Sequence, residues 1–367
     1  GAFARAYSIM MSARQGPIYM CYDAGLQEAQ LDHDVEMPPD DAIRVPMPPM
    51  ADPEALAKAA DTLAAAKRVA IISDFAARPP HGWNHIVELA ETLGASVWDV
   101  GSRLNFPTDH PLNLTMDPHG CYEGVDVVLT LDVADFEKHT HVRDIATRTV
   151  VSKVQPKATW IDIGFTDIET SKWSMDYARP YYAQQRMVAD PVTTVPQLTR
   201  LLKERIAKTS GLGEKIAQRK EAIGKRHAET RAKWSKQAQE HWDSKPMTVP
   251  RLALEVWDAI KGEDWVLTAG DLGSWGKKLW NFDRPYCHGG RELGTGTQIG
   301  LSLGVALANK GTGRLVVDLQ PDGDLMFDAG SLWIAAKYQI PMLVVMFNNR
   351  AYYNDWNHQL VLARTRG

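Results

Sequence analysis

The most informative part of this chain is RLVVDLQPDGDLMFDAGSLWIAAKYQIPMLVVMFNNRAYYND, residues Arg314–Asp355. Arg314–Leu319 and Met342–Phe347 are apolar runs with the composition of buried strands, and apolar residues recur at helical spacing over Ala329–Gln339. A strand, a helix and a strand in this order form a parallel β-α-β unit with a right-handed crossover. The pattern therefore predicts an α/β fold built on parallel sheets.

Two polar residues follow these two strands. Asp322 lies in the turn Pro321–Asp324, and Asn349 comes 27 positions later, after the second strand. The carboxyl ends of parallel strands meet at one edge of the sheet, where open α/β sheets bind ligands. A carboxylate and a carboxamide oxygen at that edge suit a hard cation such as Mg²⁺. Asp and Asn also form ordinary turns after strands, so this pair alone favours neither interpretation.

Composition excludes several classes of protein. The 367 residues are 44% apolar and carry a net charge of −4, with no basic face for nucleic acid. No apolar run approaches the ~18 residues of a membrane span, and no signal-peptide pattern is present. The three cysteines, Cys21, Cys121 and Cys287, are too few and too scattered for a disulfide framework or a zinc site. We expect a cytoplasmic protein with two or three domains that binds neither nucleic acid nor membrane.

The first 50 residues do not form a complete domain. Phe3–Ser12 has helical spacing, Ile18–Tyr22 has the pattern of a buried strand, and a Pro-rich linker follows over residues 38–51. One helix and one strand cannot make a core alone. The chain also starts without Met and stops soon after Phe347. We therefore expect both ends to be cuts through a longer polypeptide.

Strands and helices alternate from Asp52 to Leu202, as in a doubly wound domain. The turn after its first strand, Ser73–Pro80, has no glycine, whereas dinucleotide-binding domains carry a Gly-rich turn there, so we expect no nucleotide. Lys203–Ser244 mixes basic, acidic and apolar residues, which favours an exposed helix over a nucleic-acid surface. The predicted elements are strands at Arg68–Ile72, Ser96–Trp98, Val125–Leu131 and Ala158–Ile163, and helices at Pro53–Ala65, His85–Leu93 and Val195–Leu202.

Three glycine-containing turns mark the α/β unit that begins at Thr248. They lie at Asp271–Gly273, Gly294–Gly296 and Asp322–Gly323. Glycine turns ahead of helices offer backbone N–H groups to anions. The Gly294-x-Gly296-x-x-x-Gly300 spacing differs from GxGxxG and by itself fits close helix packing equally well. Together with Asp322 and Asn349, the three turns predict a diphosphate site with its own metal.

A family resemblance rests on this motif. An Asp-Gly pair, about 27 residues and then Asn-Asn after an apolar strand resembles the thiamine diphosphate motif of the acetolactate synthase and 2-oxo acid decarboxylase group. The segment Phe106-Pro107-x-x-His110-Pro111 is similar to that family's middle domain. The resemblance implies tandem doubly wound parallel-sheet domains, a thiamine diphosphate-binding fold with a Rossmann-like middle domain. The implied segments are 1–37 (end of a pyrimidine-binding domain), 38–51 (linker), 52–202 (middle domain), 203–247 (charged helical linker) and 248–367 (incomplete diphosphate-binding domain).

The resemblance also implies which residues hold the cofactor and its metal. Mg²⁺ would bind Asp322, the side-chain oxygen of Asn349 and the backbone carbonyl of Ala351. Pro321 stands where the family has glycine. Thr295 stands where a large apolar residue bends the cofactor, and Leu293 is the alternative for that role. The implied cofactor contacts are Gly273, Ser274, Trp275, Leu293, Gly294, Thr295, Gly323, Asp324, Asn349 and Tyr353. FAD is not expected, because the middle-domain glycines that hold it in some acetolactate synthases are absent.

The implied activity is decarboxylation of a 2-oxo acid, with or without joining of the product to a second carbonyl, as in acetolactate synthase. The activating glutamate is expected upstream of Gly1, and the family's shared active sites imply a homodimer or homotetramer. His288, Tyr352 and His358 are candidates for substrate contact or proton transfer; from sequence alone, packing and surface roles are favoured for each. Thr295 and Pro321 favour an alternative, an inactive homologue with a structural or regulatory role. The missing GxGxxG argues against a nucleotide-dependent oxidoreductase.

Overall fold

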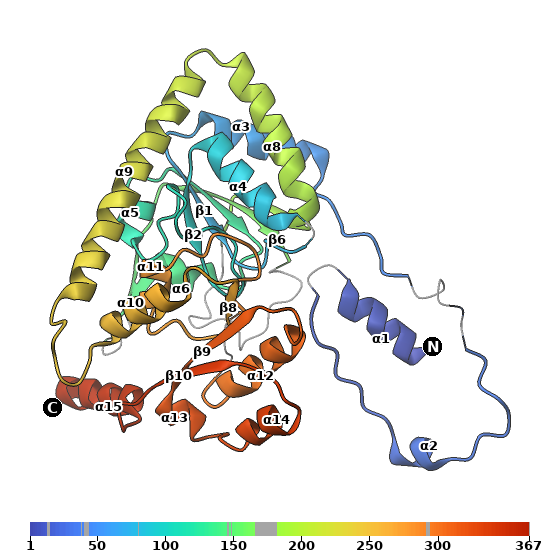
Figure 1. Cartoon of the computed structure of the whole chain (residues 1–367). Coiled ribbons are helices and arrows are strands. Elements are labelled where there is room, and N and C mark those ends of the chain that lie inside the picture. Colours follow the sequence, from blue (N-terminus) through green and yellow to red (C-terminus); the bar gives the residue numbers. More distant parts are fainter. Residues whose placement is uncertain are drawn as a thin grey trace.

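The computed structural model describes residues 1–12, 15–37, 39, 44–79, 81–144, 147, 149–165, 182–290 and 294–366. It is an α/β protein with two parallel sheets, as the sequence predicts (Figure 1). No helix in these ranges is long and apolar enough to cross a membrane.

The first part contains α1 (Ala2–Met11), α2 (Ala24–Glu28), α3 (Pro53–Ala65), β1 (Val69–Ser73), α4 (Gly82–Leu93), β2 (Ser96–Asp99), α5 (Pro118–Tyr122), β3 (Val127–Leu131), α6 (Phe136–Thr140), β4 (His141–Arg143), β5 (Val150–Ser152), β6 (Thr159–Gly164), β7 (Gln185–Val188), α8 (Pro191–Lys208) and α9 (Leu212–Gln239). The C-terminal unit contains α10 (Val249–Ile260), β8 (Trp265–Leu267), α11 (Trp275–Leu279), α12 (Gln298–Ala308), β9 (Leu315–Pro321), α13 (Asp322–Leu325), α14 (Ser331–Lys337), β10 (Leu343–Phe347) and α15 (Tyr353–Arg366).

The middle sheet has five parallel strands in the order β2-β1-β3-β6-β7. The central strands β1 and β3 are buried at every position, because helices cover both faces of a parallel sheet. Helices α3 and α4 both pack against α8 (Figure 1). The predicted strands and the helices at Pro53–Ala65 and His85–Leu93 are confirmed to within three residues, whereas the helix predicted over Val195–Leu202 is much longer and runs from Pro191 to Lys208. Strand β7 was not predicted, because its Gln-Arg-Met-Val sequence has no apolar run.

The C-terminal sheet has three parallel strands in the order β10-β9-β8. β9 is buried at its centre, whereas β10 is half exposed, with Leu343 43% and Met346 48% accessible. Met342–Phe347 does contain the predicted strand, but the prediction that this strand is buried is wrong. β10 pairs only with β9 among the described residues, so it is an edge strand and its composition alone did not show that.

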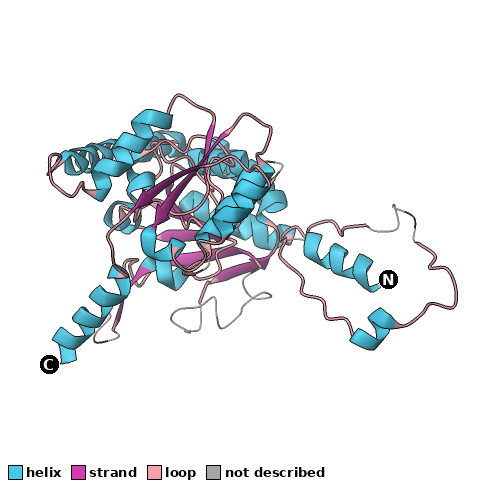
Figure 2. Ribbon diagram, turned by 60° about the horizontal axis from the view of Figure 1, so that its bottom comes forward, coloured by secondary structure: helices cyan, strands magenta, loops and turns pink. Residues whose placement is uncertain are grey.

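The N-terminal segment makes little contact with the rest of the chain. The predicted helix is present as α1, but none of its residues is buried. The predicted buried strand Ile18–Tyr22 is wrong: this segment is irregular and Tyr19 is 92% exposed. A strand needs a neighbour to pair its backbone groups, and within the described residues Ile18–Tyr22 has none. In Figure 2, where strands are magenta, the N-terminal segment and α15 both extend away from the two sheets.

The middle and C-terminal units share one apolar core. Ile71 of β1 and Leu129 of β3 belong to the same cluster of buried side chains as Trp265 of β8 and Trp280 at the end of α11. At the junction, the Thr108 hydroxyl donates to the Trp280 carbonyl at 2.8 Å and accepts from the Phe282 backbone at 2.9 Å. Arg231 of α9 donates to the carbonyls of Thr108 at 3.0 Å and Leu279 at 3.1 Å. The sheets are therefore held together by packing and by buried hydrogen bonds.

Candidate cofactor and metal site

The structure brings Asp322 and the turn after β10 together. One carboxylate oxygen of Asp322 accepts from the backbone N–H of Asn349 at 3.3 Å, and the other accepts from Arg350 at 3.1 Å. Because β9 and β10 are adjacent and parallel, their carboxyl ends lie at the same sheet edge. The convergence expected from the sequence spacing is therefore present, and it is formed by the backbone of one turn and the side chain of the other.

The oxygens at this edge suit a magnesium ion. The Asp322 carboxylate has lone pairs left beside its two backbone hydrogen bonds. Among the described residues, the Asn349 side-chain oxygen accepts a hydrogen bond from the Ala351 N–H alone, at 3.0 Å. The Ala351 carbonyl oxygen lies 3.9 Å from where a side chain on Gly323 would begin. A carboxylate, an amide and a carbonyl oxygen are hard donors of the kind that Mg²⁺ prefers. Within the described residues no three His, Cys, Asp or Glu side chains gather around a possible metal position, so a metal here depends on such mixed oxygens.

The turn at Gly294–Gly296 is joined to the turn at Asp322–Asp324. The Gly296 N–H donates to the Asp324 carboxylate at 2.5 Å, and Gly296 has a φ of +82°. A Cβ at Gly296 would lie 2.8 Å from the Cβ of Phe327, so this position needs glycine for both its φ and its space. Thr295 is exposed beside it. Leu293, the predicted alternative for shaping the cofactor, lies outside the described residues.

The third turn is held by Asp271. Leu272, Gly273 and Ser274 all have positive φ, at 56°, 62° and 75°. The Asp271 carboxylate accepts from the Ser274 N–H at 2.8 Å and so stabilises this costly conformation. Around a Cβ placed on Gly273, no described atom beyond the chain neighbours lies within 4 Å. The predicted contact residues Gly273 and Ser274 therefore lie on an open turn just before α11, which begins at Trp275.

A buried polar network lies behind these turns. Gln298, the first residue of α12, donates its side-chain N–H groups to the Asp318 carboxylate at 2.7 Å and to the Leu319 carbonyl at 2.8 Å. The hydroxyls of Thr268 and Ser302 are 2.7 Å apart. The second carboxylate oxygen of Asp318 is buried and has no hydrogen-bond partner in the described structure. Burial raises the pKa of Asp318, and hydrogen bonds from Gln298 oppose that rise.

This network was not found by sequence reasoning. Its only sequence signal is Asp318, which lies inside the apolar run Leu315–Leu319. A strand that is covered on both faces cannot hold an unpaired charge, so this aspartate needs a partner. Because Gln298 connects the start of α12 to β9, the network fixes the glycine turn before α12 relative to the Asp322 turn after β9.

His288 is close to the site but does not titrate near neutrality. Desolvation and the nearby Lys277 ammonium lower the pKa of His288 to about 4. Its Nδ1 accepts from the Gly290 N–H at 3.0 Å, so the imidazole is neutral with its proton on Nε2. A pKa of about 4 does not favour the hypothesis that His288 shuttles a proton by titrating near neutral pH.

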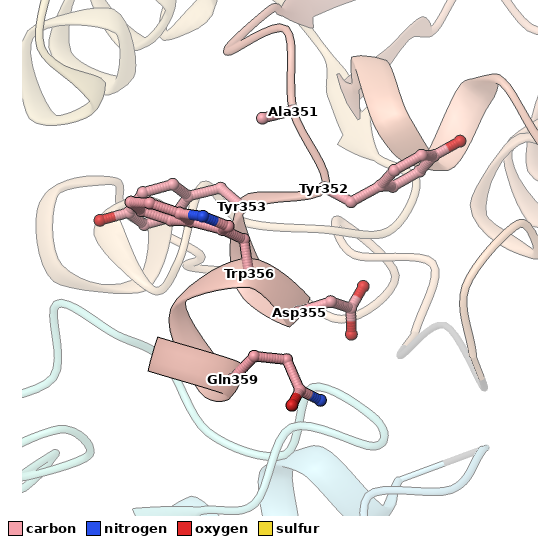
Figure 3. Close-up of a pocket in the computed structure, with 6 residues that line it drawn as sticks. All are labelled: Ala351, Tyr352, Tyr353, Asp355, Trp356 and Gln359. Carbon is pink, nitrogen blue, oxygen red and sulfur yellow. The ribbon is translucent and has the colours of Figure 1, made fainter. Parts of the chain in front are cut away.

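The remaining candidates lie at and beyond the metal-site turn (Figure 3). Tyr352 packs on Gly323 and forms an edge-to-face pair with Phe327, whereas Tyr353 points the other way and lies beside Trp356, with ring centres 5.5 Å apart. Tyr352, Tyr353 and Trp356 line an open cavity of about 530 Å³ with Ala351, Asp355 and Gln359. His358 is exposed on α15. The structure thus places Tyr352 against the predicted metal site, and Tyr353 in the cavity next to it.

Residues 268–363 match the family described as thiamine pyrophosphate enzyme, C-terminal TPP binding domain. This match contains all three glycine turns, Asp322 and Asn349. It confirms the family resemblance that the Asp-Gly and Asn-Asn motif indicated.

Solved structures of thiamine diphosphate-dependent enzymes share this fold. One is such an enzyme from Mycobacterium smegmatis (TM-score 0.67, 18% identity, 96% of this chain and 63% of that one). Another is benzoylformate decarboxylase from Polynucleobacter necessarius (TM-score 0.68, 17% identity, 98% and 62%). A third is 4-hydroxybenzoylformate decarboxylase from Rhodococcus jostii RHA1 (TM-score 0.59, 17% identity, 89% and 57%). The chain spans about three fifths of the length of these structures.

Proposed function

We propose that this chain, whose C-terminal segment belongs to the thiamine pyrophosphate enzymes, binds thiamine diphosphate and Mg²⁺ and acts in the decarboxylation of a 2-oxo acid. The observation that supports this proposal most strongly is the meeting of the Asp322 carboxylate with the Asn349–Ala351 turn at the carboxyl edge of the sheet. The geometry supports a metal-anchored diphosphate there, because the glycine turn at Gly296 is joined to the same place through Asp324.

In this proposal, Asp322, the Asn349 side-chain oxygen and the Ala351 carbonyl hold Mg²⁺. Gly273, Ser274 and Trp275, on the open turn before α11, contact the diphosphate, together with Gly323 and Asp324. Gly294, Thr295 and Tyr353 are the further proposed contacts, as is Leu293. When bound, thiamine diphosphate supplies the electron sink that loss of CO₂ from a 2-oxo acid requires.

The residues of this chain orient the cofactor and do not transfer its first proton. The carboxylates of Asp271 and Asp324 each accept a hydrogen bond from a backbone N–H of a glycine turn, and so hold two of the three turns in place. Neutral His288 is fixed as an Nε2–H donor beside Lys277 and keeps that form at neutral pH. Tyr352 and His358 remain candidates for substrate contact. The group that activates the cofactor is proposed to be a glutamate from a part of the protein outside this sequence.

The substrate is proposed to be a small 2-oxo acid, with benzoylformate as the first compound to test. Two of the similar structures are named for decarboxylation of benzoylformate or its 4-hydroxy derivative. The aromatic lining from Tyr352, Tyr353 and Trp356 also favours a substrate with an apolar side chain. Joining of the decarboxylated product to a second carbonyl, as in acetolactate synthase, is the other outcome we propose to test. FAD, nucleic acid and membrane are not part of the proposal.

We also propose that the protein is a cytoplasmic homodimer or homotetramer, built from the segments 1–37, 38–51, 52–202, 203–247 and 248–367. Large apolar side chains are exposed across the C-terminal unit, including Phe327 (61%), Trp333 (63%) and Met346 (48%). An apolar surface of this kind favours burial against another chain or domain. Analytical ultracentrifugation of the full-length protein tests the assembly, and a monomer at micromolar concentration would contradict it.

The test of the main proposal is calorimetry. Thiamine diphosphate should bind the full-length protein only with Mg²⁺ present, and EDTA should release it. Release of CO₂ from benzoylformate or pyruvate then tests catalysis. Binding without any CO₂ release would favour the second candidate, an inactive homologue with a structural or regulatory role. Pro321 at the motif and the exposed Thr295 are the features that favour it. Absence of cofactor binding would refute both.

A further inference from the structure

A second cavity lies in the middle unit, at the opposite edge of its sheet from the ends of β1 and β3 where an α/β domain binds ligands. It has a volume of about 270 Å³ and opens between the segment that leads into β1, the helix α5 and the long helix α9. Four cationic side chains line it, together with one carboxylate. The charged residues are Lys67, Arg68, Arg219, Arg226 and Glu123.

Two of these charges already have a partner. Arg226 donates to both carboxylate oxygens of Asp117, at 2.6 and 3.0 Å. Glu123 lies 3.1 Å from the His119 side chain, one helical turn away. Arg226 is therefore paired with Asp117, whereas Glu123 keeps its negative charge at the rim of the cavity.

Within the described part of the chain, Lys67, Arg68 and Arg219 have no salt bridge. Arg68 donates to the Gly120 carbonyl at 2.5 Å, and Arg219 donates to the carbonyls of Ala66 at 3.2 Å and Lys67 at 3.4 Å. Carbonyl oxygens satisfy these N–H groups but leave the positive charges uncompensated. The Nε of Arg219 is buried and has no hydrogen-bond partner in the described chain. A buried charged group that lacks a hydrogen-bond partner costs free energy, so the unpaired Nε of Arg219 points to a missing partner.

The nearby carboxylate of Asp126 does not supply that partner. Asp126 attracts Arg219 electrostatically. However, its two oxygens accept the backbone N–H groups of Lys67 at 2.9 Å and Arg68 at 2.8 Å. The cations at this cavity, Lys67, Arg68, Arg219 and Arg226, therefore outnumber the carboxylates beside them in the described chain, which are Asp117, Asp126 and Glu123.

We propose that this cavity binds a small phosphate-bearing anion. A phosphate group carries a charge of about −1.5 to −2 and several acceptor oxygens, which match convergent cations better than a single carboxylate does. Guanidinium groups suit phosphate because they donate two parallel hydrogen bonds. The volume is just below the range of about 300–1,000 Å³ typical of drug-sized ligands, which favours a compact ligand. This site is separate from the thiamine diphosphate site and does not depend on the proposed function.

The experiment uses the full chain and inorganic phosphate as the probe. Binding is measured by calorimetry and by the thermal midpoint Tm, at constant ionic strength set with NaCl. Phosphate should bind in the millimolar range or tighter and raise Tm, because a ligand of the folded state stabilises it. In Arg219→Gln the affinity should fall about 10-fold or more, since a charge-assisted hydrogen bond is lost. The matched control is Lys215→Gln, which removes the same charge from an exposed position on the same helix and should leave binding unchanged.

Three results would overturn the proposal. They are no phosphate binding by the wild-type chain, equal losses in Arg219→Gln and Lys215→Gln, and binding of succinate at least as tight as that of phosphate. If Arg219→Gln does not fold by circular dichroism, Lys67→Gln carries the same test. The Lys67 side chain is exposed and makes no hydrogen bond or salt bridge to another side chain among the described residues, so its loss leaves the fold intact.

Discussion

Replacing Asp322 by alanine tests whether this carboxylate holds a metal or only closes a turn. In the structure, Asp322 accepts two backbone hydrogen bonds, from Asn349 at 3.3 Å and from Arg350 at 3.1 Å. Both are long and partly exposed, so together they contribute only about 1–2 kcal/mol to stability. Without cofactor, Asp322→Ala should therefore lower Tm by only a few degrees.

The effect on the cofactor should be much larger. Loss of residues that merely support metal ligands costs about 10–100-fold in affinity, so loss of a direct carboxylate ligand should cost at least about 100-fold. That corresponds to about 2.8 kcal/mol or more of binding free energy. Calorimetric titration of thiamine diphosphate with Mg²⁺ measures it, and thermal unfolding of the same sample without ligand measures the stability.

Asp322→Asn is the matched control for charge. Asparagine keeps one acceptor for the backbone N–H groups but loses the carboxylate charge, so the fold should change little while the cofactor still binds at least about 10-fold more weakly. If Asp322→Ala bound thiamine diphosphate and Mg²⁺ as tightly as the wild type, the metal assignment would be refuted. If ligand-free Asp322→Ala were unfolded, the reasoning on stability would be wrong.

Three further predictions follow from the site. Burial raises the pKa of Asp318, so the stability linked to its protonated form is present at low pH and is lost as pH rises through the folded-state pKa. Urea unfolding should therefore show that Asp318→Asn is more stable than the wild type at about pH 8 but not at about pH 4. Gly296→Ala should destabilise the folded protein by about 1–3 kcal/mol, because Gly296 has a positive φ and lies next to Phe327. Gly300→Ala is the control and should be neutral or stabilising, because Gly300 is in a helix and no described atom beyond its own helix and chain neighbours lies within 4 Å of an added Cβ. Since the pKa of His288 is about 4, His288→Gln should not remove any inflection between about pH 6 and 8 from a rate profile, and loss of such an inflection would contradict the assigned neutral state.

Local sequence patterns predicted many of the helices and strands, because the spacing of apolar residues reflects the period of a helix or strand and the face that it buries. Asp322 and Asn349 were expected to converge from the rule that parallel strands end at one edge, and the hydrogen bonds between their turns agree with it. Most strands and helices between Asp52 and Leu202 were predicted from local sequence patterns, whereas β7, which has no apolar run, was not. Cofactor contacts at individual residues such as Gly273 and Tyr353 stay predictions, because their test is a bound ligand.

What the sequence by itself determined is the α/β class, the family of the C-terminal segment and the edge at which its polar residues gather, because each depends on spacing along the chain. Only the tertiary structure decided which apolar segments are buried strands: Ile18–Tyr22 and Met342–Phe347 have the composition of buried strands, but the first is irregular and the second is half exposed, because pairing and burial depend on neighbours that composition does not specify. It also decided the pairing of Gln298 with Asp318, the low pKa of His288 and the meeting of Lys67 with Arg219 in one cavity. These contacts join residues that are 11 or more positions apart, and tertiary packing determines the burial and charge around each of them.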